Sequence, residues 1–236
     1  SLIETDSDRF VIEYLSPALR KKLDTSSVQW TDLQNMLLKE YHDEVGSSDV
    51  VREALTKVPL DPAMIQVCQL LHSSGWTLAV ISDANTVYID SILKHYGIRD
   101  LFSAIITNPA FFDDQDRLQI HRHIPADGPP HGCPLGICSL NICKGQEMDK
   151  LLLSPTGSPV APKRILYVGD GRNDYCPGLR LRHHDDLYFV RRGRSLERYF
   201  ETGPGVPNAI RGKIVYWERP SEILRELQQV ITLNSL

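Results

Sequence analysis

The amino-acid sequence predicts an α/β protein, in which a parallel, Rossmann-like sheet is covered by helices and carries a small helical cap. Short apolar segments of strand length alternate with helical patterns from residue 74 onward. Before that point the periodicity is helical throughout. Two of the apolar segments run directly into turns rich in Ser, Asp and Gly. Strands buried on both faces read as continuous apolar runs, and helices connect them in parallel sheets.

Residues 9–73 are predicted to form the cap. Apolar residues recur at helical spacing in four segments, residues 10–19, 33–41, 50–58 and 62–71. Thr31 can cap the second helix, Ser48 or Asp49 can start the third, and Pro62 suits the first turn of the fourth.

Residues 74–236 are predicted to form the core. Its strands are expected at residues 76–81, 104–106, 164–168, 187–190 and 213–217. A helix follows the first strand and stops at Gly97, a short one follows Lys144, and the last two strands each precede a helix. The irregular segment at about 108–143 is long for a loop, so we expect it to hold a small hairpin or flap.

Composition excludes several classes of function. The 236 residues include 26 Lys and Arg against 30 Asp and Glu, a formal charge of −4, so no nucleic-acid partner is expected. The apolar runs are too short to cross a bilayer, no signal peptide is visible, and no obligate protein partner is evident. Five cysteines without a secretory signal indicate a reducing compartment, and we expect the protein to be cytoplasmic.

The strongest chemical signal follows the strand at residues 164–168. Asp170 and Asp174 stand four residues apart around a glycine-rich turn. Open α/β sheets place their sites at the carboxyl ends of strands, and Mg²⁺ prefers oxygen ligands and keeps several waters. The alternative is a capped turn in which Asp174 starts the next helix.

Two other positions could hold a phosphate group. Ser82 ends one strand before a helix, where a hydroxyl and free amides can bind a phosphate oxygen. The alternative for Ser82 is an ordinary N-cap. Lys144 lies between the irregular segment and a helix, where it could neutralise phosphate charge, although a lone lysine is usually solvated.

In this order, Ser82, Lys144 and the Gly-Asp-Gly-x-Asn-Asp segment resemble motifs two, three and four of the haloacid dehalogenase superfamily. Further segments resemble its phosphoethanolamine/phosphocholine phosphatase and pyridoxal phosphate phosphatase family: residues 82–85, 107–109, 138–144, 167–171, 173–177 and 191–193. The resemblance covers nearly the whole chain. It implies the superfamily's fold and a phosphatase, a hydrolase of small phosphorylated metabolites.

Residues 1–8 resemble the remnant of the superfamily's first motif, Asp-x-Asp-x-Thr/Ser, with Ser1 at the Thr/Ser position. The nucleophilic aspartate would then lie four residues before Ser1, and the acid/base aspartate two before it. Either the sequence is a fragment of a normal enzyme, or the chain lacks this strand. Without the two aspartates we expect the chain to be inactive.

The resemblance implies catalysis through an aspartyl-phosphate on the first of these aspartates, with the second as general acid and base. Mg²⁺ is expected at Asp170, with Asp174 completing the metal site through its water shell. Ser82 and Lys144 are expected to hold the transferring phosphoryl group, so that all four residues are catalytic candidates.

The same resemblance places Asp8 and Asp83 near the leaving group of the substrate, and Ser1, Asn85 and Gly171 among the substrate-binding residues. Two carboxylates suit an ammonium group, as in phosphoethanolamine or phosphocholine. Pyridoxal phosphate, pyrophosphate and thiamine phosphate remain alternatives, as does a non-catalytic phosphate-binding module. Without such a role, Asp8 would cap the first helix and Asp83 would be a solvated turn residue.

A group of cysteines and histidines lies in and near the irregular segment: Cys133, Cys138, Cys143, His121, His123 and His131. Zinc sites usually contain a close cysteine pair such as Cys-x2-Cys, which is missing. We therefore expect the thiols to pack as small apolar groups, and the pairing of His131 with Cys133 keeps a zinc site open.

Overall fold

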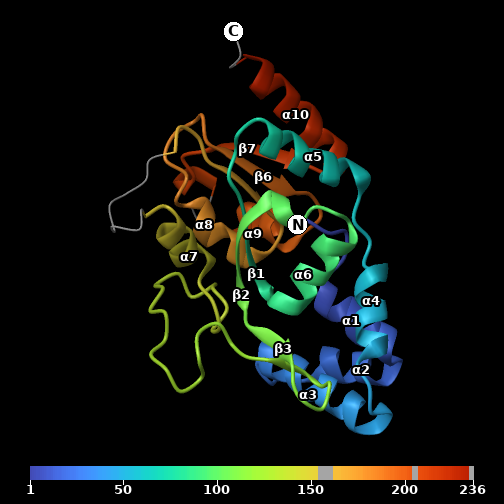
Figure 1. Ribbon diagram of the computed structural model, residues 1–236. Helices are drawn as coiled ribbons and strands as arrows, with labels where there is room; N and C mark the ends of the chain where they lie inside the picture. The colour runs from blue at the N-terminus through green and yellow to red at the C-terminus, as the bar shows by residue number, and fades with distance from the viewer. Residues whose placement is uncertain (154–161, 204–206, 234–236) are drawn as a thin grey trace. The chain divides into compact units, whose positions relative to one another are not determined.

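The computed structural model describes residues 1–153, 162–203 and 207–233 (Figure 1). The chain divides into two compact units, which we call the first unit (residues 3–130) and the second unit (residues 1–2 and 131–236). The boundary predicted between a cap at 9–73 and a core at 74–236 stays a prediction. No helix in the described part of the chain is both long and apolar enough to span a membrane.

The first unit begins with five helices, α1 (Ser7–Leu15), α2 (Pro17–Thr25), α3 (Trp30–Val45), α4 (Asp49–Lys57) and α5 (Pro62–Ser73). The single helix predicted over residues 10–19 was wrong, because the chain breaks at Ser16, which is extended at φ −164° and ψ 125°. Pro17 causes the break, since proline lacks an N–H and disfavours the helical conformation in the residue before it.

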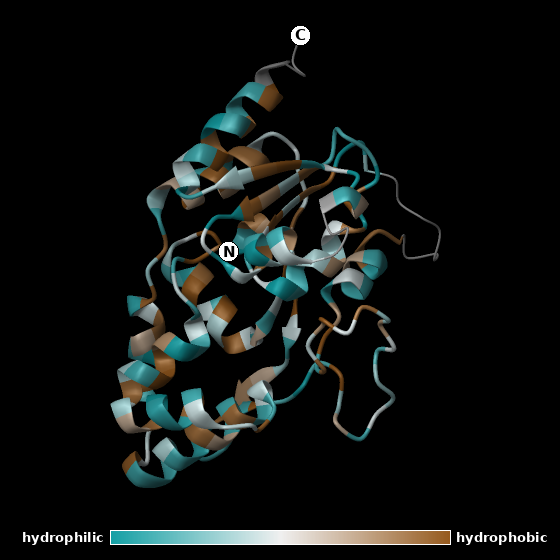
Figure 2. Ribbon diagram, turned by 180° about the vertical axis from the view of Figure 1, so that it is seen from behind, coloured by the Kyte–Doolittle hydropathy of each residue, from teal (hydrophilic) through white to brown (hydrophobic). Residues whose placement is uncertain are grey.

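These helices pack through one apolar face each. Buried side chains from α1, α3, α4 and α6 form a single hydrophobic cluster that includes Val11, Ile12, Leu37, Leu55 and Tyr88. In Figure 2 the same helices alternate between hydrophobic and hydrophilic colours along their turns, as amphipathic helices do.

Two strands of the first unit pair in parallel, β1 (Leu78–Asn85) and β2 (Phe102–Asn108), and α6 (Thr86–His95) and η1 (Arg99–Leu101) connect them. β1 continues four residues beyond its predicted end, with a register shift between Ile81 and Asn85. The hairpin expected in the irregular segment is confirmed as β3 (Ala110–Phe112) and β4 (Leu118–Ile120), which pair antiparallel.

The second unit contains a parallel sheet in the order β5 (Leu166–Gly169), β6 (Leu187–Arg191) and β7 (Lys213–Trp217). Its helices are α7 (Lys144–Leu151), η2 (Arg172–Asp174), α8 (Tyr175–Gly178), α9 (Ser195–Thr202), η3 (Pro207–Ala209) and α10 (Pro220–Leu233). The central strand β6 is apolar and buried from Leu187 to Val190, as predicted for a parallel sheet.

Candidate active site

Asp174 is a buried carboxylate that accepts four hydrogen bonds within the second unit. Its Oδ1 accepts from the Lys144 ammonium and from the Tyr167 hydroxyl, each at 2.8 Å. Its Oδ2 accepts from the main-chain N–H groups of Asp170 at 3.0 Å and Gly171 at 2.9 Å. One cation and three neutral donors therefore bind the side chain, which compensates for its burial.

The turn after β5 is shaped so that Asp174 can fold back onto it. A Cβ atom on Gly169 would lie 2.7 Å from the Asp174 Cβ, so only glycine leaves room for this approach. From β6, the Tyr188 hydroxyl donates to the Asp174 carbonyl oxygen at 2.6 Å. The predicted alternative, a capped turn in which Asp174 starts the next helix, also holds: the Asp174 side chain caps the turn through the Gly171 N–H, and Asp174 is the N-cap residue of α8.

Asp170 lies at the carboxyl end of β5 with its carboxylate partly exposed. Its Oδ1 accepts from the Ser1 hydroxyl at 2.7 Å. Burial raises the pKa of Asp170, whereas the Ser1 hydroxyl and Lys144 lower it. Among residues 1–153, 162–203 and 207–233, none donates to Oδ2, so this oxygen is open to a ligand.

In the first unit, residues 82–85 form the carboxyl end of β1, where the register shifts. The Asn108 amide donates to the carbonyl oxygens of Asp83 at 2.6 Å and Ala84 at 2.8 Å. The Ser82 hydroxyl accepts from the Ala84 N–H at 3.2 Å. Asn85 caps α6 by accepting from the Tyr88 N–H at 3.0 Å, so the alternative in which Ser82 caps this helix was wrong.

Asp8 is a buried carboxylate on α1 of the first unit. Its Oδ2 accepts from the Trp30 indole N–H at 2.7 Å, whereas Oδ1 is buried and, within the described residues, receives no hydrogen bond. Burial raises the pKa of Asp8 to about 8, with Asp6 and Asp83 adding to the rise and Trp30 opposing it. Asp6, not Asp8, caps α1 through the Arg9 N–H, so that alternative for Asp8 was wrong.

The predicted site residues thus lie in two groups. The second unit brings together Ser1, Lys144, Asp170, Gly171 and Asp174, and the first unit holds Asp8, Ser82, Asp83 and Asn85. The meeting of the two groups at one phosphate stays a prediction, as do the roles of the individual residues.

Sequence reasoning missed two residues that hold these groups in place. Tyr167 lies inside an apolar strand segment and reads as core, although its hydroxyl binds Asp174. Trp30 is the first residue of α3, and no pattern in the sequence links it to Asp8. For neither contact does the sequence carry a local signal.

A parallel α/β fold with carboxylates, a lysine and a serine beyond its strands defines the class as a phosphatase of the haloacid dehalogenase superfamily. The family model described as "Putative Phosphatase" matches residues 1–231, so the chain belongs to that family. The family resemblance seen in the sequence is therefore confirmed.

Curated relatives and a solved structure agree with this assignment. A thiamine phosphate phosphatase-like protein of Arabidopsis thaliana is 32% identical over 98% of this chain and 92% of its own length. Inorganic pyrophosphatase 2 of the same plant is 35% identical over 78% of this chain, and the match spans 65% of that protein. A pyridoxal phosphate phosphatase of Mus musculus is 28% identical over 99% of this chain and 95% of its own length.

A substrate-bound phosphoserine phosphatase structure is 12% identical and aligns with a TM-score of 0.53 over 96% of this chain and 93% of its own. This likeness shows the fold, which confirms the predicted α/β class with a parallel sheet.

Proposed function

We propose that this phosphatase is a Mg²⁺-dependent phosphomonoester hydrolase whose substrate is a small metabolite with a cationic group, of the phosphoethanolamine or phosphocholine type. The observation that carries the proposal is the arrangement at the end of β5. There Oδ2 of the Asp170 carboxylate accepts no hydrogen bond from the described residues. Asp174 accepts from the Asp170 N–H and from the Lys144 ammonium. The steps that the family resemblance assigns to two aspartates upstream of Ser1 remain predictions.

The donor set at the end of β5 fits a magnesium ion. Asp170 offers a hard oxygen ligand, and its partial exposure leaves room for the waters that Mg²⁺ keeps. Both oxygens of Asp174 already accept hydrogen bonds, so we assign it to orienting the Asp170 turn and Lys144. A bound Mg²⁺ would neutralise charge on the phosphoryl oxygens.

Lys144 and Ser82 are proposed to contact the phosphoryl group. The Lys144 side chain is only 12% exposed and is oriented by Asp174, so its position is fixed before substrate binds. Ser82 lies directly before Asp83 and Ala84, whose carbonyl oxygens accept hydrogen bonds from the Asn108 side-chain amide. Donors that are held in place in advance stabilise developing charge without reorganisation.

The preference for a cationic substrate rests on Asp8. Its buried Oδ1 lacks a donor within the described residues, and an ammonium group would supply one. Asp83 acts on the Asp8 carboxyl electrostatically and helps to raise its pKa, which a cation bound there would lower again. Trp30 adds an aromatic ring beside the same carboxylate, which suits a quaternary ammonium.

Pyridoxal phosphate and pyrophosphate are the alternatives that the relatives' names raise. Pyrophosphate lacks the ammonium group that we propose Asp8 to bind. A non-catalytic phosphate-binding module would not require the four donors that hold Asp174 in place. The free cysteines suit a reducing compartment, and we propose a cytoplasmic location on that ground.

The test is a phosphate-release assay on the full gene product, including whatever precedes Ser1. The substrates are phosphocholine, phosphoethanolamine, pyridoxal phosphate, pyrophosphate and glycerol phosphate, each with Mg²⁺, after chelation and after Mg²⁺ is restored. We expect activity only with the metal and a preference for the two cationic esters. Activity that survives chelation, or that is unchanged in Asp170→Ala, would contradict the metal assignment.

Asp8→Asn is the variant that tests substrate class. We expect its KM for phosphocholine to rise at least about tenfold, the size of one charge-assisted contact of about 1.5 kcal/mol, with no change for glycerol phosphate. Asp49→Asn, which alters an exposed carboxylate in the same unit, is the matched control. Equal KM changes for charged and uncharged esters would overturn the role of Asp8.

A further inference from the structure

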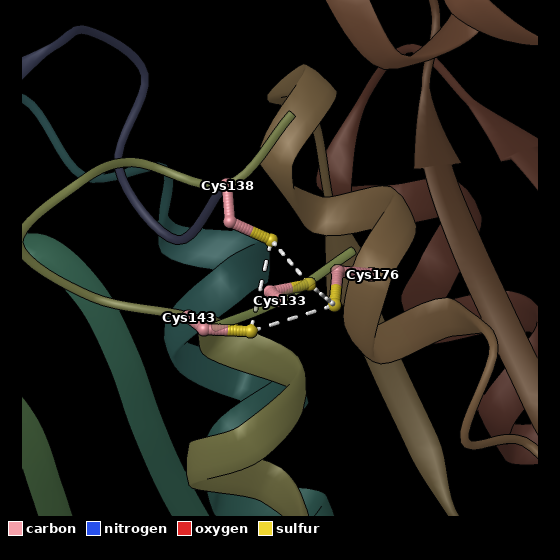
Figure 3. A group of neighbouring side chains, drawn as sticks. All are labelled: Cys133, Cys138, Cys143 and Cys176. Carbon is pink, nitrogen blue, oxygen red and sulfur yellow. Dashed lines mark hydrogen bonds between the residues drawn. The ribbon is translucent and has the colours of Figure 1, made fainter. Parts of the chain in front are cut away.

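Four cysteines of the second unit converge on one point. Cys133 and Cys138 come from the irregular segment, Cys143 directly precedes α7, and Cys176 lies in α8 (Figure 3). All four sulfur atoms lie within 4.8 Å of one another. Cys68, the remaining cysteine of the sequence, belongs to α5 in the first unit and takes no part.

The sulfur atoms form a closed ring in which each has two sulfur neighbours. The Cys133–Cys138 distance is 3.5 Å, Cys138–Cys143 and Cys143–Cys176 are 3.6 Å, and Cys176–Cys133 is 3.8 Å. A disulfide would bring two sulfurs to about 2.05 Å, so no pair is bonded. Four thiolates at about 2.3 Å from a tetrahedral zinc lie about 3.8 Å apart, which matches the ring.

The surroundings fit a bound cation rather than the packing of small apolar groups. Cys133 and Cys138 are partly exposed, so burial of apolar surface does not explain their convergence. The Arg180 guanidinium donates to the Cys176 sulfur at 3.4 Å, and the Gln146 N–H donates to Cys143. Four thiolates around Zn²⁺ carry a net charge of −2, which a neighbouring arginine and main-chain N–H groups offset.

The histidine considered from the sequence has another role. His131 Nδ1 accepts from the Cys133 N–H at 3.0 Å, and Nε2 lies 3.1 Å from the Ser139 carbonyl oxygen. Both ring nitrogens are thus engaged in fixing the loop that carries Cys133. The fourth sulfur comes instead from Cys176, which the sequence places 33 residues beyond Cys143.

We propose that Cys133, Cys138, Cys143 and Cys176 bind one structural zinc ion as a tetrathiolate site. The four protein ligands close the tetrahedron, so the site leaves no position for substrate or water. Binding releases the thiol protons to solvent and leaves sulfur and zinc in their oxidation states, so no oxidant or reductant is needed.

The zinc site would tie together the two segments that carry the Lys144–Asp174 pair. Lys144 directly follows the ligand Cys143, and Asp174 lies two residues before the ligand Cys176. Close packing here depends on Gly145, because a Cβ atom on it would lie 2.5 Å from the Cys176 sulfur. The ion therefore acts on the active site by positioning, and its presence can be measured without any phosphatase assay.

The direct test is the metal content of the unmodified protein, purified without chelators from a zinc-supplemented culture and analysed by plasma mass spectrometry. We expect about one zinc per chain. Replacement by Co²⁺ should give the thiolate charge-transfer and tetrahedral ligand-field bands of a four-sulfur site. Absence of bound zinc, a disulfide between any of the four cysteines in protein purified with a thiol reductant present, or iron in place of zinc would overturn the proposal.

Substitutions of single residues test whether the zinc is bound by these four cysteines. Cys138→Ser and Cys176→Ser should each lower the retained zinc at least about tenfold, and Arg180→Gln should weaken zinc affinity about 10- to 100-fold. Cys68→Ala is the matched control for loss of a buried thiol, and Asp170→Asn separates this site from the proposed magnesium site. Both controls should keep their zinc. Unchanged zinc in the two serine variants would contradict the proposal, and the cobalt spectrum of the unmodified protein decides it if they do not fold.

Discussion

The Lys144 ammonium donates to Asp174 Oδ1 at 2.8 Å, and the two side chains are only 12% and 4% exposed. Breaking a buried ion pair of this kind is costly, because removing either member leaves an uncompensated charge. Lys144 begins α7 and Asp174 ends η2, so the pair fixes two segments that are 30 residues apart in sequence.

Removing one member of this pair should therefore destabilise the protein. We expect Lys144→Met to lower the free energy of unfolding by about 3 kcal/mol, measured by urea denaturation with the metal content kept constant. The exposed pair of Lys39 and Asp43 on α3 provides the control, and Lys39→Met should cost less than about 0.5 kcal/mol.

A double-mutant cycle adds a sharper test of the same pair. Because Lys144→Met leaves a buried charge that Asp174→Asn removes, the double variant should be more stable than the two single losses predict when summed. Additive losses would mean that the two side chains do not interact in solution.

Tyr167 is a positioning residue for Asp174, to which its hydroxyl donates at 2.8 Å. Tyr167→Phe keeps the ring in β5 and removes only this donor, so we expect a loss of about 1 kcal/mol in stability. Phosphatase kcat should fall about tenfold and the Mg²⁺ concentration for half-maximal activity should rise. The reason is that Asp174, which accepts from the Asp170 N–H, would lose one of its hydrogen-bond donors.

The control is Tyr14→Phe, which removes an exposed hydroxyl that donates to Glu53 in the first unit. It should leave stability, kcat and the Mg²⁺ concentration for half-maximal activity unchanged. A Tyr167→Phe enzyme with an unaltered Mg²⁺ dependence would show that the hydroxyl contributes to stability alone.

The parts of this molecule that sequence reasoning could predict are those encoded within a few adjacent residues. The turn from β5 into Asp170 and Asp174 was predictable, because an apolar strand and its glycine-rich continuation are contiguous. The break between α1 and α2 is also encoded locally, because Pro17 starts α2, although the apolar spacing runs across it.

Contacts between distant segments lacked such signals. The bond from Trp30 to Asp8 spans 22 residues, and that from Tyr167 to Asp174 begins inside an apolar strand. Cys176 lies in the segment after Asp174, far along the sequence from the cysteines and histidines of the irregular segment. Spacing rules find ligands that share one loop, and this cluster draws its fourth ligand from another element.

Asp8 should make the stability of the protein depend on pH in an unusual direction. Its pKa is raised to about 8, chiefly by burial, from the ordinary value of 3.8. The folded state therefore binds a proton that the unfolded state releases, and stability falls as pH rises between about 4 and 8, by at most about 1.4 kcal/mol per pH unit.

Asp8→Asn removes this titration, while its side-chain oxygen can still accept from Trp30. We expect the variant to be more stable than the native protein at pH 8, with the difference shrinking toward pH 5, in urea titrations at each pH. A difference that is constant over this range would mean that Asp8 does not carry the proton. Arg9, which lowers the pKa of Asp8, and Asp6 and Asp83, which raise it, are left unchanged in the comparison.

Asp186 should give the opposite dependence, on the acid side. It is fully buried before β6 and accepts from the Ile165 N–H at 2.7 Å and the Arg182 N–H at 2.8 Å. Burial raises its pKa, but the Arg182 side chain and these N–H groups outweigh it, so the pKa is lowered. Its stabilising effect is thus complete above the unfolded pKa of about 3.9 and is lost as pH falls through the lower folded value.

We expect Asp186→Asn to lose about 3 kcal/mol of stability at pH 7, because an amide cannot satisfy the same donors as an ion. The loss should shrink below about pH 4, where the unfolded carboxyl takes up a proton while the native carboxylate is still ionised. The neighbouring Asp185 is half exposed and lies 3.9 Å from Arg164, so Asp185→Asn should change stability by less than about 0.5 kcal/mol. If the two variants were equally stable at pH 7, Asp186 would not anchor the edge between β5 and β6.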